Sequence, residues 1–165
     1  MLHRRPTQLA LQATLLLATE PKHGWQRVRD LARALGVSAP YLTKVLQGLT
    51  RAGLLRAVRG YGHGVQLARP PQEICLWDVV LACEPAEEFQ RCIVGLDGCD
   101  DVAPCPLHAF WAPVRAQILE MLQTKSVEEL AAETKSMGLL RWQLPPRNGS
   151  SSSRPAKKRS LRRSQ

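Results

Sequence analysis

The feature that most constrains the fold is a turn of three residues, Gly36-Val37-Ser38, between two amphipathic helical stretches. Residues 26–35 carry apolar side chains at helical spacing, and residues 39–52 do the same. Gly36 suits the position just after a helix, and Ser38 suits the N-cap of the next one. Two helices joined by so tight a turn predict a helix-turn-helix.

A two-stranded hairpin is predicted directly after the second of these helices. Strands at residues 54–58 and 65–68 flank a tip, residues 59–64, that contains three glycines. Upstream, residues 7–19 predict another amphipathic helix. We therefore expect a mainly α fold with a small β-wing, in which residues 1–70 form a winged helix-turn-helix unit.

Charge is strongly segregated along the chain, whose formal net charge is +9. Residues 1–70 hold eleven Lys and Arg against two acidic residues, whereas residues 71–144 are acidic and residues 145–165 are basic. A compact basic unit favours a polyanion, and with a helix-turn-helix it predicts double-stranded DNA. The third helix would enter the major groove by its N-terminal end, and the wing tip would contact a minor groove or phosphates. The predicted DNA-contacting residues are Ser38, Ala39, Tyr41, Thr43, Lys44 and Arg59.

Beyond the wing, the chain alternates helices with one loop. A short helix is predicted over residues 74–83, with Trp77, Val80 and Leu81 facing the core. Ser126 and Glu129 form a capping box that predicts a last helix near residues 127–136. We divide this part into a connecting helix, a cysteine loop, a dimerisation helix with a C-terminal helix, and a disordered basic tail: residues 71–88, 89–105, 106–144 and 145–165.

A long helix is predicted from about Pro106 to Gln123, and its apolar residues recur at steps of four, three, four and three. This is an a/d seam over about two heptads, which is typical of a dimerisation helix. An ordinary core-facing helix has the same pattern, so both interpretations stay open. The seam consists of Leu107, Trp111, Val114, Ile118 and Met121.

Five cysteines lie between residues 75 and 105. An odd number in a chain expected to be cytoplasmic favours metal binding or redox chemistry over a disulfide framework. The last three have the spacing C-x6-C-x5-C, and a histidine follows three residues later. Three thiolates and one nitrogen can hold an iron–sulfur cluster or a tetrahedral zinc, with free or redox-active thiols as the alternative. The predicted metal ligands are Cys92, Cys99, Cys105 and His108, whereas Cys75 and Cys83 are expected to be small buried hydrophobic residues.

Other classes of protein find little support. No apolar run approaches the roughly 20 residues of a membrane span, and polar residues interrupt the apolar N-terminal stretch, which disfavours a signal peptide. The glycines at the wing tip precede a strand, so they lack the context of a dinucleotide-binding loop. We see no nucleophile–base pairing and no paired carboxylates. We therefore expect a cytoplasmic protein that is not an enzyme and has neither a membrane partner nor a small-molecule substrate.

Four segments together resemble the IscR/NsrR (Rrf-type) winged-helix regulators, over about residues 7–135. They correspond to the family's recognition helix, its wing, the segment after the wing, and its cluster loop with the dimer helix: residues 37–46, 59–69, 74–80, and the three cysteines with Cys105-Pro106-Leu107-His108 and Trp111. The resemblance implies a homodimer on a two-fold-related operator, with DNA affinity controlled by an iron–sulfur cluster, 2Fe–2S or 4Fe–4S. The same dimer controlled by thiol oxidation or carrying structural zinc is the first alternative. A winged helix that binds only protein is the second.

The chain departs from the family pattern in several places. His63 and Val65 stand where the family commonly has Gly and Tyr, and the first two cysteines have six residues between them where five are usual. Some members take a fourth cluster ligand from an acidic residue early in the partner's first helix. Here Gln8 occupies that region, and no acid precedes Glu20. This favours His108 or an outside ligand.

Overall fold

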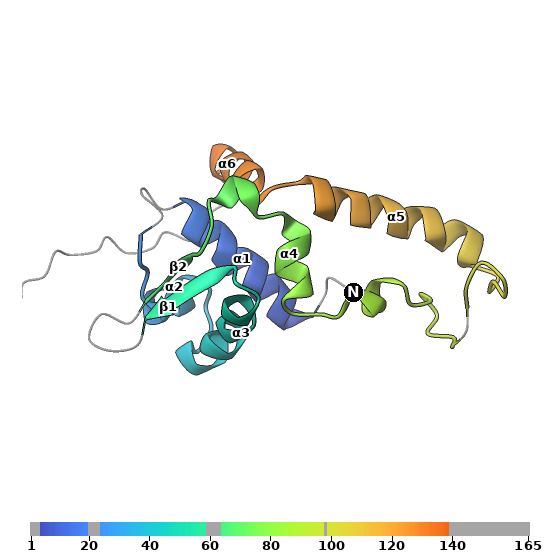
Figure 1. Cartoon of the computed structure of the whole chain (residues 1–165), viewed down its shortest axis with the longest axis horizontal. Coiled ribbons are helices and arrows are strands. Elements are labelled where there is room, and N and C mark those ends of the chain that lie inside the picture. Colours follow the sequence, from blue (N-terminus) through green and yellow to red (C-terminus); the bar gives the residue numbers. More distant parts are fainter. Residues whose placement is uncertain (1–3, 20–23, 59–63, 98, 139–165) are drawn as a thin grey trace, which may run out of the picture.

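The computed structural model describes residues 4–19, 24–58, 64–97 and 99–138 of the chain. This part is mainly helical with one small antiparallel sheet, as expected from the sequence (Figure 1). Two short 3-10 turns, η1 and η2, flank the fourth helix. The elements are α1 Arg5–Thr19, α2 Val28–Ala34, α3 Ala39–Arg51, β1 Leu55–Val58, β2 Gly64–Leu67, η1 Pro71–Glu73, α4 Leu76–Leu81, η2 Ala86–Phe89, α5 His108–Thr124 and α6 Val127–Ser136.

The helix-turn-helix is present as predicted. α2 and α3 pack on each other, and Gly36 in the turn between them has φ +65°, a conformation that favours glycine. Ser38 occupies the N-cap position of α3 with an extended backbone, although its side chain makes no capping hydrogen bond. The predicted inner face of α3 is buried, which leaves the opposite face to solvent. Its buried residues are Leu42, Val45, Leu46 and Leu49.

The wing has a third participant that the sequence analysis placed wrongly. β1 and β2 pair antiparallel, from Leu55 opposite Leu67 to Val58 opposite Gly64. Gln26 was expected in the second helix, but α2 begins only at Val28. Instead, Gln26 exchanges two backbone hydrogen bonds of 2.8 Å with Val65, beside β2.

The reason for this pairing is the glycine that begins β2. A Cβ atom on Gly64 would lie 2.9 Å from the carbonyl oxygen of Gln26, so only glycine permits this close approach. The wing tip, residues 59–63, lies outside the described residues, and with it the predicted DNA contact Arg59 and the departure at His63.

α1 is the central element of the body, in contact with α3, α4 and α6 (Figure 1). Its apolar face is fully buried, and Thr7 on the same helix donates a hydrogen bond to Glu84, which is 2% exposed. The capping box of α6 also forms as predicted. The Ser126 N–H donates to Glu129 at 2.9 Å, and this bond lowers the pKa of the Glu129 carboxyl.

α4 is shorter than predicted, and its inner face differs. Val80 is buried and Trp77 is half-buried, but Leu81 is 41% exposed, so its predicted core position is wrong. The buried residues Leu76, Val79 and Val80 follow helical spacing, and Leu81 lies one step round the helix from them.

The two remaining cysteines were expected to be buried, but both are only half-buried. Cys83 packs against the core, and burial raises the pKa of its thiol. Cys75 instead occupies the N-cap position of α4, where its N–H donates to Asp78 at 3.3 Å. The position before a short helix leaves this side chain at the edge of the core.

α5 extends away from the body, and the segment from η2 to residue 107 runs out alongside it (Figure 1). The helix begins at His108, two residues after the predicted start, and Pro113 lies inside it. Only its C-terminal half reaches the core, through Leu122, which is 2% exposed, and through the half-buried Ile118 and Leu119, so the seam residue Ile118 faces the core of its own chain. Three seam residues are open to solvent in the single chain: Leu107 is 48% exposed, Val114 44% and Met121 48%. No helix in the described part of the chain is long and apolar enough to cross a membrane.

The contact between α3 and α4 gives a stability prediction with a definite sign. A Cβ on Gly48 would lie 2.8 Å from the carbonyl oxygen of Ala82, a backbone atom that cannot move aside cheaply. Helix propensity alone would make Gly48→Ala more stable by about 1 kcal/mol. We expect the clash to dominate, so that the free energy of unfolding falls by about 1–3 kcal/mol in urea titrations. Gln47→Ala, exposed on the same helix, should change it by less than about 0.5 kcal/mol. A Gly48→Ala protein more stable than wild type would contradict this contact.

Candidate metal centre

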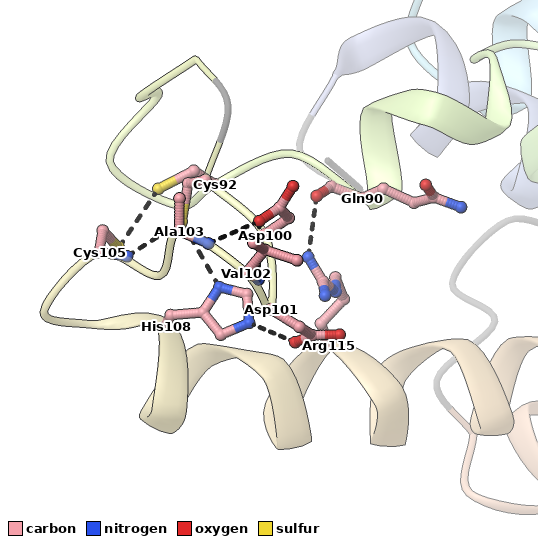
Figure 2. Close-up of polar contacts among 10 residues, drawn as sticks. Gln90, Cys92, Asp100, Asp101, Val102, Ala103, Cys105, His108 and Arg115 are labelled. Atoms are coloured by element: carbon pink, nitrogen blue, oxygen red, sulfur yellow. Dashed lines mark hydrogen bonds and ion pairs between the residues drawn. The ribbon is translucent and has the colours of Figure 1, made fainter.

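Three of the predicted ligands converge beside the first residue of α5. The Sγ atoms of Cys92, Cys99 and Cys105 all lie within 4.8 Å of one another, and no other group of three potential ligands occurs in the described residues. Cys92 Sγ and Cys105 Sγ are 3.6 Å apart (Figure 2). We call these three residues the cysteine triad. Side chains separated by up to thirteen positions are therefore gathered by one loop.

Two side chains of α5 hold the start of this loop. Arg115 donates a hydrogen bond of 2.8 Å to the carbonyl oxygen of Gln90, which Figure 2 shows from the helix side. Trp111, one turn earlier, donates through its indole N–H to the carbonyl oxygen of Arg91 at 3.3 Å. Cys92 follows immediately. Trp111, predicted as a dimerisation residue, thus also anchors the loop.

An aspartate organises the second half of the loop. One oxygen of Asp100 accepts the N–H groups of Val102 and Ala103, both at 2.8 Å, and these bonds lower the pKa of its carboxyl. The resulting turn brings the chain back, so that the N–H of Cys105 donates to Cys99 Sγ at 3.4 Å. The sequence analysis missed Asp100, although an Asp that hydrogen-bonds the backbone two residues on is a known turn signal.

His108 lies beside the cysteine triad but is not part of it. It is the first residue of α5 and is 9% exposed. Its Nδ1 atom is 3.4 Å from Cys99 Sγ, and its Nε2 atom is 2.9 Å from a carboxylate oxygen of Asp101 (Figure 2). The structure therefore brings the fourth predicted ligand next to one sulfur only.

The thiols affect one another's ionisation. Backbone N–H groups of Leu96 and Val94 and the neighbouring thiols lower the pKa of Cys92 to about 7. The N–H of Cys105 also acts to lower the pKa of Cys99, but desolvation and the adjacent thiols outweigh it, so that this pKa is raised. One thiolate therefore forms easily and further negative charge is disfavoured. A bound cation would remove that penalty.

The donor set fits a thiophilic metal. Cysteine sulfur, with a nearby imidazole, suits zinc or an iron–sulfur cluster and does not suit calcium or magnesium. A cleft of about 360 Å³ opens beside Cys92 and Cys99, so small molecules can reach these sulfurs. Its other lining residues are Glu87, Gln90, Arg91, Gly95, Leu96 and Asp97.

Five of the six predicted DNA-contacting residues lie at the start of α3, and the sixth, Arg59, lies outside the described residues. Ser38, Tyr41, Thr43 and Lys44 are exposed, whereas Ala39 is half-buried and packs against the core. The hydroxyl of Thr43 donates to the carbonyl oxygen of Ala39 at 2.7 Å, which occupies its proton. A groove of about 610 Å³, not anticipated from the sequence, separates the outer face of α3 from the wing strands.

Sequence comparison places residues 4–133 in a match to Rrf2, a family described as "Iron-dependent Transcriptional regulator". The chain is 38% identical over 115 residues to Protein aau3 of Rhizobium meliloti strain 1021, covering 69% of this chain and 75% of that protein. It is 31% identical over 121 residues to the HTH-type transcriptional regulator IscR of Photorhabdus laumondii, covering 73% of each. It is 30% identical to the regulator NsrR of Shouchella clausii, covering 75% of this chain and 84% of NsrR.

Solved structures agree with the fold. The IscR of T. potens superposes with a TM-score of 0.62 at 25% identity, covering 81% of this chain and 88% of that one. CymR, the global cysteine regulator of B. subtilis, gives a TM-score of 0.67 at 23% identity, covering 79% and 96%. The second likeness shows the shared fold alone.

The lowered pKa of Cys92 predicts selective alkylation of the metal-free protein. At pH 7 about half of a thiol with pKa 7 is thiolate, against about 1% for a thiol of pKa 9. We expect iodoacetamide to modify Cys92 first, with a rate that falls as the pH is lowered through about 7. Fragment-ion mass spectrometry assigns each site. Cys83, whose pKa is raised, is the internal control, and equal rates at Cys83 and Cys92 would contradict the assignment.

Proposed function

The chain belongs to the Rrf2 family of transcriptional regulators, and from that premise we propose that it is a homodimeric DNA-binding regulator controlled by an iron–sulfur cluster on Cys92, Cys99 and Cys105. The observation that carries this proposal is the cysteine triad itself, whose three sulfurs lie within 4.8 Å of one another on a loop that is hydrogen-bonded to α5. The family's description as iron-dependent supports iron over zinc. His108 or an outside ligand would complete the ligand set, and 2Fe–2S and 4Fe–4S forms both fit three thiolates.

The DNA-binding side of the proposal rests on charge and exposure. Residues 1–70 hold eleven Lys and Arg against two acids, so this unit attracts phosphates. The exposed side chains at the start of α3 are free to reach base edges in a major groove. Arg59 at the wing tip would contact a minor groove or the backbone. Basic residues on and beside α2 and α3 would contact phosphates and so position the protein without reading sequence.

The proposed dimer rests on the exposed apolar residues of α5 and on Leu107, which precedes it. A helix that extends from the body with Leu107, Val114 and Met121 each more than 40% exposed leaves an apolar stripe for a second copy to cover. Two copies related by a two-fold axis would present two recognition helices to a two-fold-related operator.

Control of DNA binding would pass through contacts already present in one chain. The loop that bears Cys92 follows Phe89, whose ring packs edge-on against Trp77 of α4 at 4.8 Å. The end of α4 abuts α3 at Ala82 and Gly48. When bound, a cluster would join the loop's three sulfurs and would make the site responsive to iron–sulfur status, nitric oxide or another oxidant. Gaining or losing the cluster would shift the population of DNA-competent dimers.

The first test is the visible spectrum, with iron and sulfide content, of the full chain purified without oxygen. We expect a brown protein with matched iron and sulfide, and loss of colour with retained fold in Cys92→Ser, Cys99→Ser and Cys105→Ser. Cys75→Ser is the matched control, because serine is well tolerated at its helix N-cap position. A variant with all three cysteines replaced that is still coloured would contradict the assignment of the cluster to the cysteine triad.

One alternative is supported by a specific distance. Cys92 Sγ and Cys105 Sγ are 3.6 Å apart, so a small movement would bring them to disulfide length, with two electrons and two protons passing to an oxidant such as a peroxide. A protein that stays colourless after anaerobic reconstitution would favour this thiol switch or structural zinc. Metal analysis separates those two outcomes.

The DNA contact has its own prediction. Arg59→Ala should weaken binding to a duplex selected from a random library by about 1–3 kcal/mol at fixed salt, as loss of one groove contact does. Fluorescence anisotropy measures it, with Lys135→Ala, an exposed change on α6, as the control. Equal affinities would rule out the wing contact. Absence of any salt-dependent shift in the wild-type chain would favour a winged helix that binds only protein.

A further inference from the structure

The contact between Asp101 and His108 has no part in the proposal above. We propose that Asp101 is a positioning residue that orients His108 as the nitrogen ligand of the centre, bound through Nδ1. This inference rests on the proposed function for the identity of the bound group. The orientation of the ring does not depend on it, because it follows from contacts within the chain.

The two ring nitrogens face different partners. Nε2 lies 2.9 Å from Asp101 Oδ1, and Nδ1 lies 3.4 Å from Cys99 Sγ. An ionised carboxylate only accepts hydrogen bonds, so in a neutral ring this contact favours the hydrogen on Nε2. Nδ1 is then left with its lone pair directed towards the cysteine triad, and a metal binds an imidazole nitrogen through its lone pair.

The chain fixes this arrangement from both ends. His108 begins α5 and is 9% exposed, so its ring has little room to turn. On the other side, Asp100 holds the N–H groups of Val102 and Ala103, which sets the backbone that carries Asp101. The two adjacent aspartates thus have separate tasks: Asp100 shapes the turn and Asp101 contacts the ring.

The exposure of Asp101 makes it testable. Its side chain is 97% exposed, so removing it opens no cavity. A carboxylate that accepts from the far nitrogen of a metal-bound histidine fixes the tautomer and strengthens the ligand. Losing such a partner typically lowers metal affinity by about 10–100-fold. Glu120 is the control, because it is an exposed carboxylate on α5, away from the three cysteines.

The first experiment uses the full chain without metal. Ring ¹⁵N shifts of labelled protein, assigned with His108→Gln, report which nitrogen carries hydrogen. We expect Nε2–H in the wild type and in Glu120→Ala, a mixture of tautomers in Asp101→Ala, and recovery in Asp101→Asn, whose side-chain oxygen still accepts. Hydrogen on Nδ1 in the wild type, or no change in Asp101→Ala, would overturn the proposal.

The second experiment follows loss of visible absorbance when a chelator is added to the anaerobically loaded protein. We expect Asp101→Ala to lose its cluster about 10–100-fold faster than wild type, Asp101→Asn to be intermediate and Glu120→Ala to match wild type. Equal rates in Asp101→Ala and Glu120→Ala would overturn the positioning role. If no variant, wild type included, ever takes up iron and sulfide, the cluster proposal fails, and the ring shifts still decide how His108 is oriented.

Discussion

The crowding of three thiols is the constraint on which the cysteine loop and its contacts with α5 depend. Sulfur atoms within 4.8 Å of one another resist ionising together, and desolvation and the neighbouring thiols together raise the pKa of Cys99. Among the described residues between Gln90 and Leu107, no hydrophobic side chain is buried to hold them there. Polar contacts do that work, from Trp111 and Arg115 at its start and from Asp100 at its return. An arrangement held at this electrostatic cost is better suited to a cation than to three free thiols.

The loop is also joined to the body at a defined place. Phe89 is 1% exposed and its ring packs edge-on with that of Trp77, so the segment leaves the core where it contacts α4. α4 contacts α1, and the carbonyl of Ala82, directly after α4, approaches α3 so closely that only glycine fits at position 48. Tightly packed contacts of this kind transmit displacement rather than absorb it. The candidate metal centre and α3 are thus linked by packed elements.

Local signals in the sequence predicted most of the fold. The apolar spacing of α3, the turn at Gly36 and the capping box at Ser126 all depend on residues a few positions apart, and each formed as expected. Gln26 failed because its partner, Val65, lies on a strand thirty-nine residues away and helical spacing cannot reveal it. The cysteine spacing predicted a shared site, but contacts of Trp111 with Arg91 or of His108 with Asp101 require the loop's path, which no periodicity specifies.

The double position of Trp111 has a consequence for how the proposed dimer and the proposed metal centre relate. The residue belongs to the seam that a second copy would cover, and its indole N–H simultaneously holds the loop just before Cys92. A partner helix packed on the seam would restrict this side chain and so favour the loop conformation that gathers the sulfurs. By linkage, whatever binds the sulfurs must favour the dimer by the same free energy. Dimerisation and metal binding would then be coupled properties of one helix face.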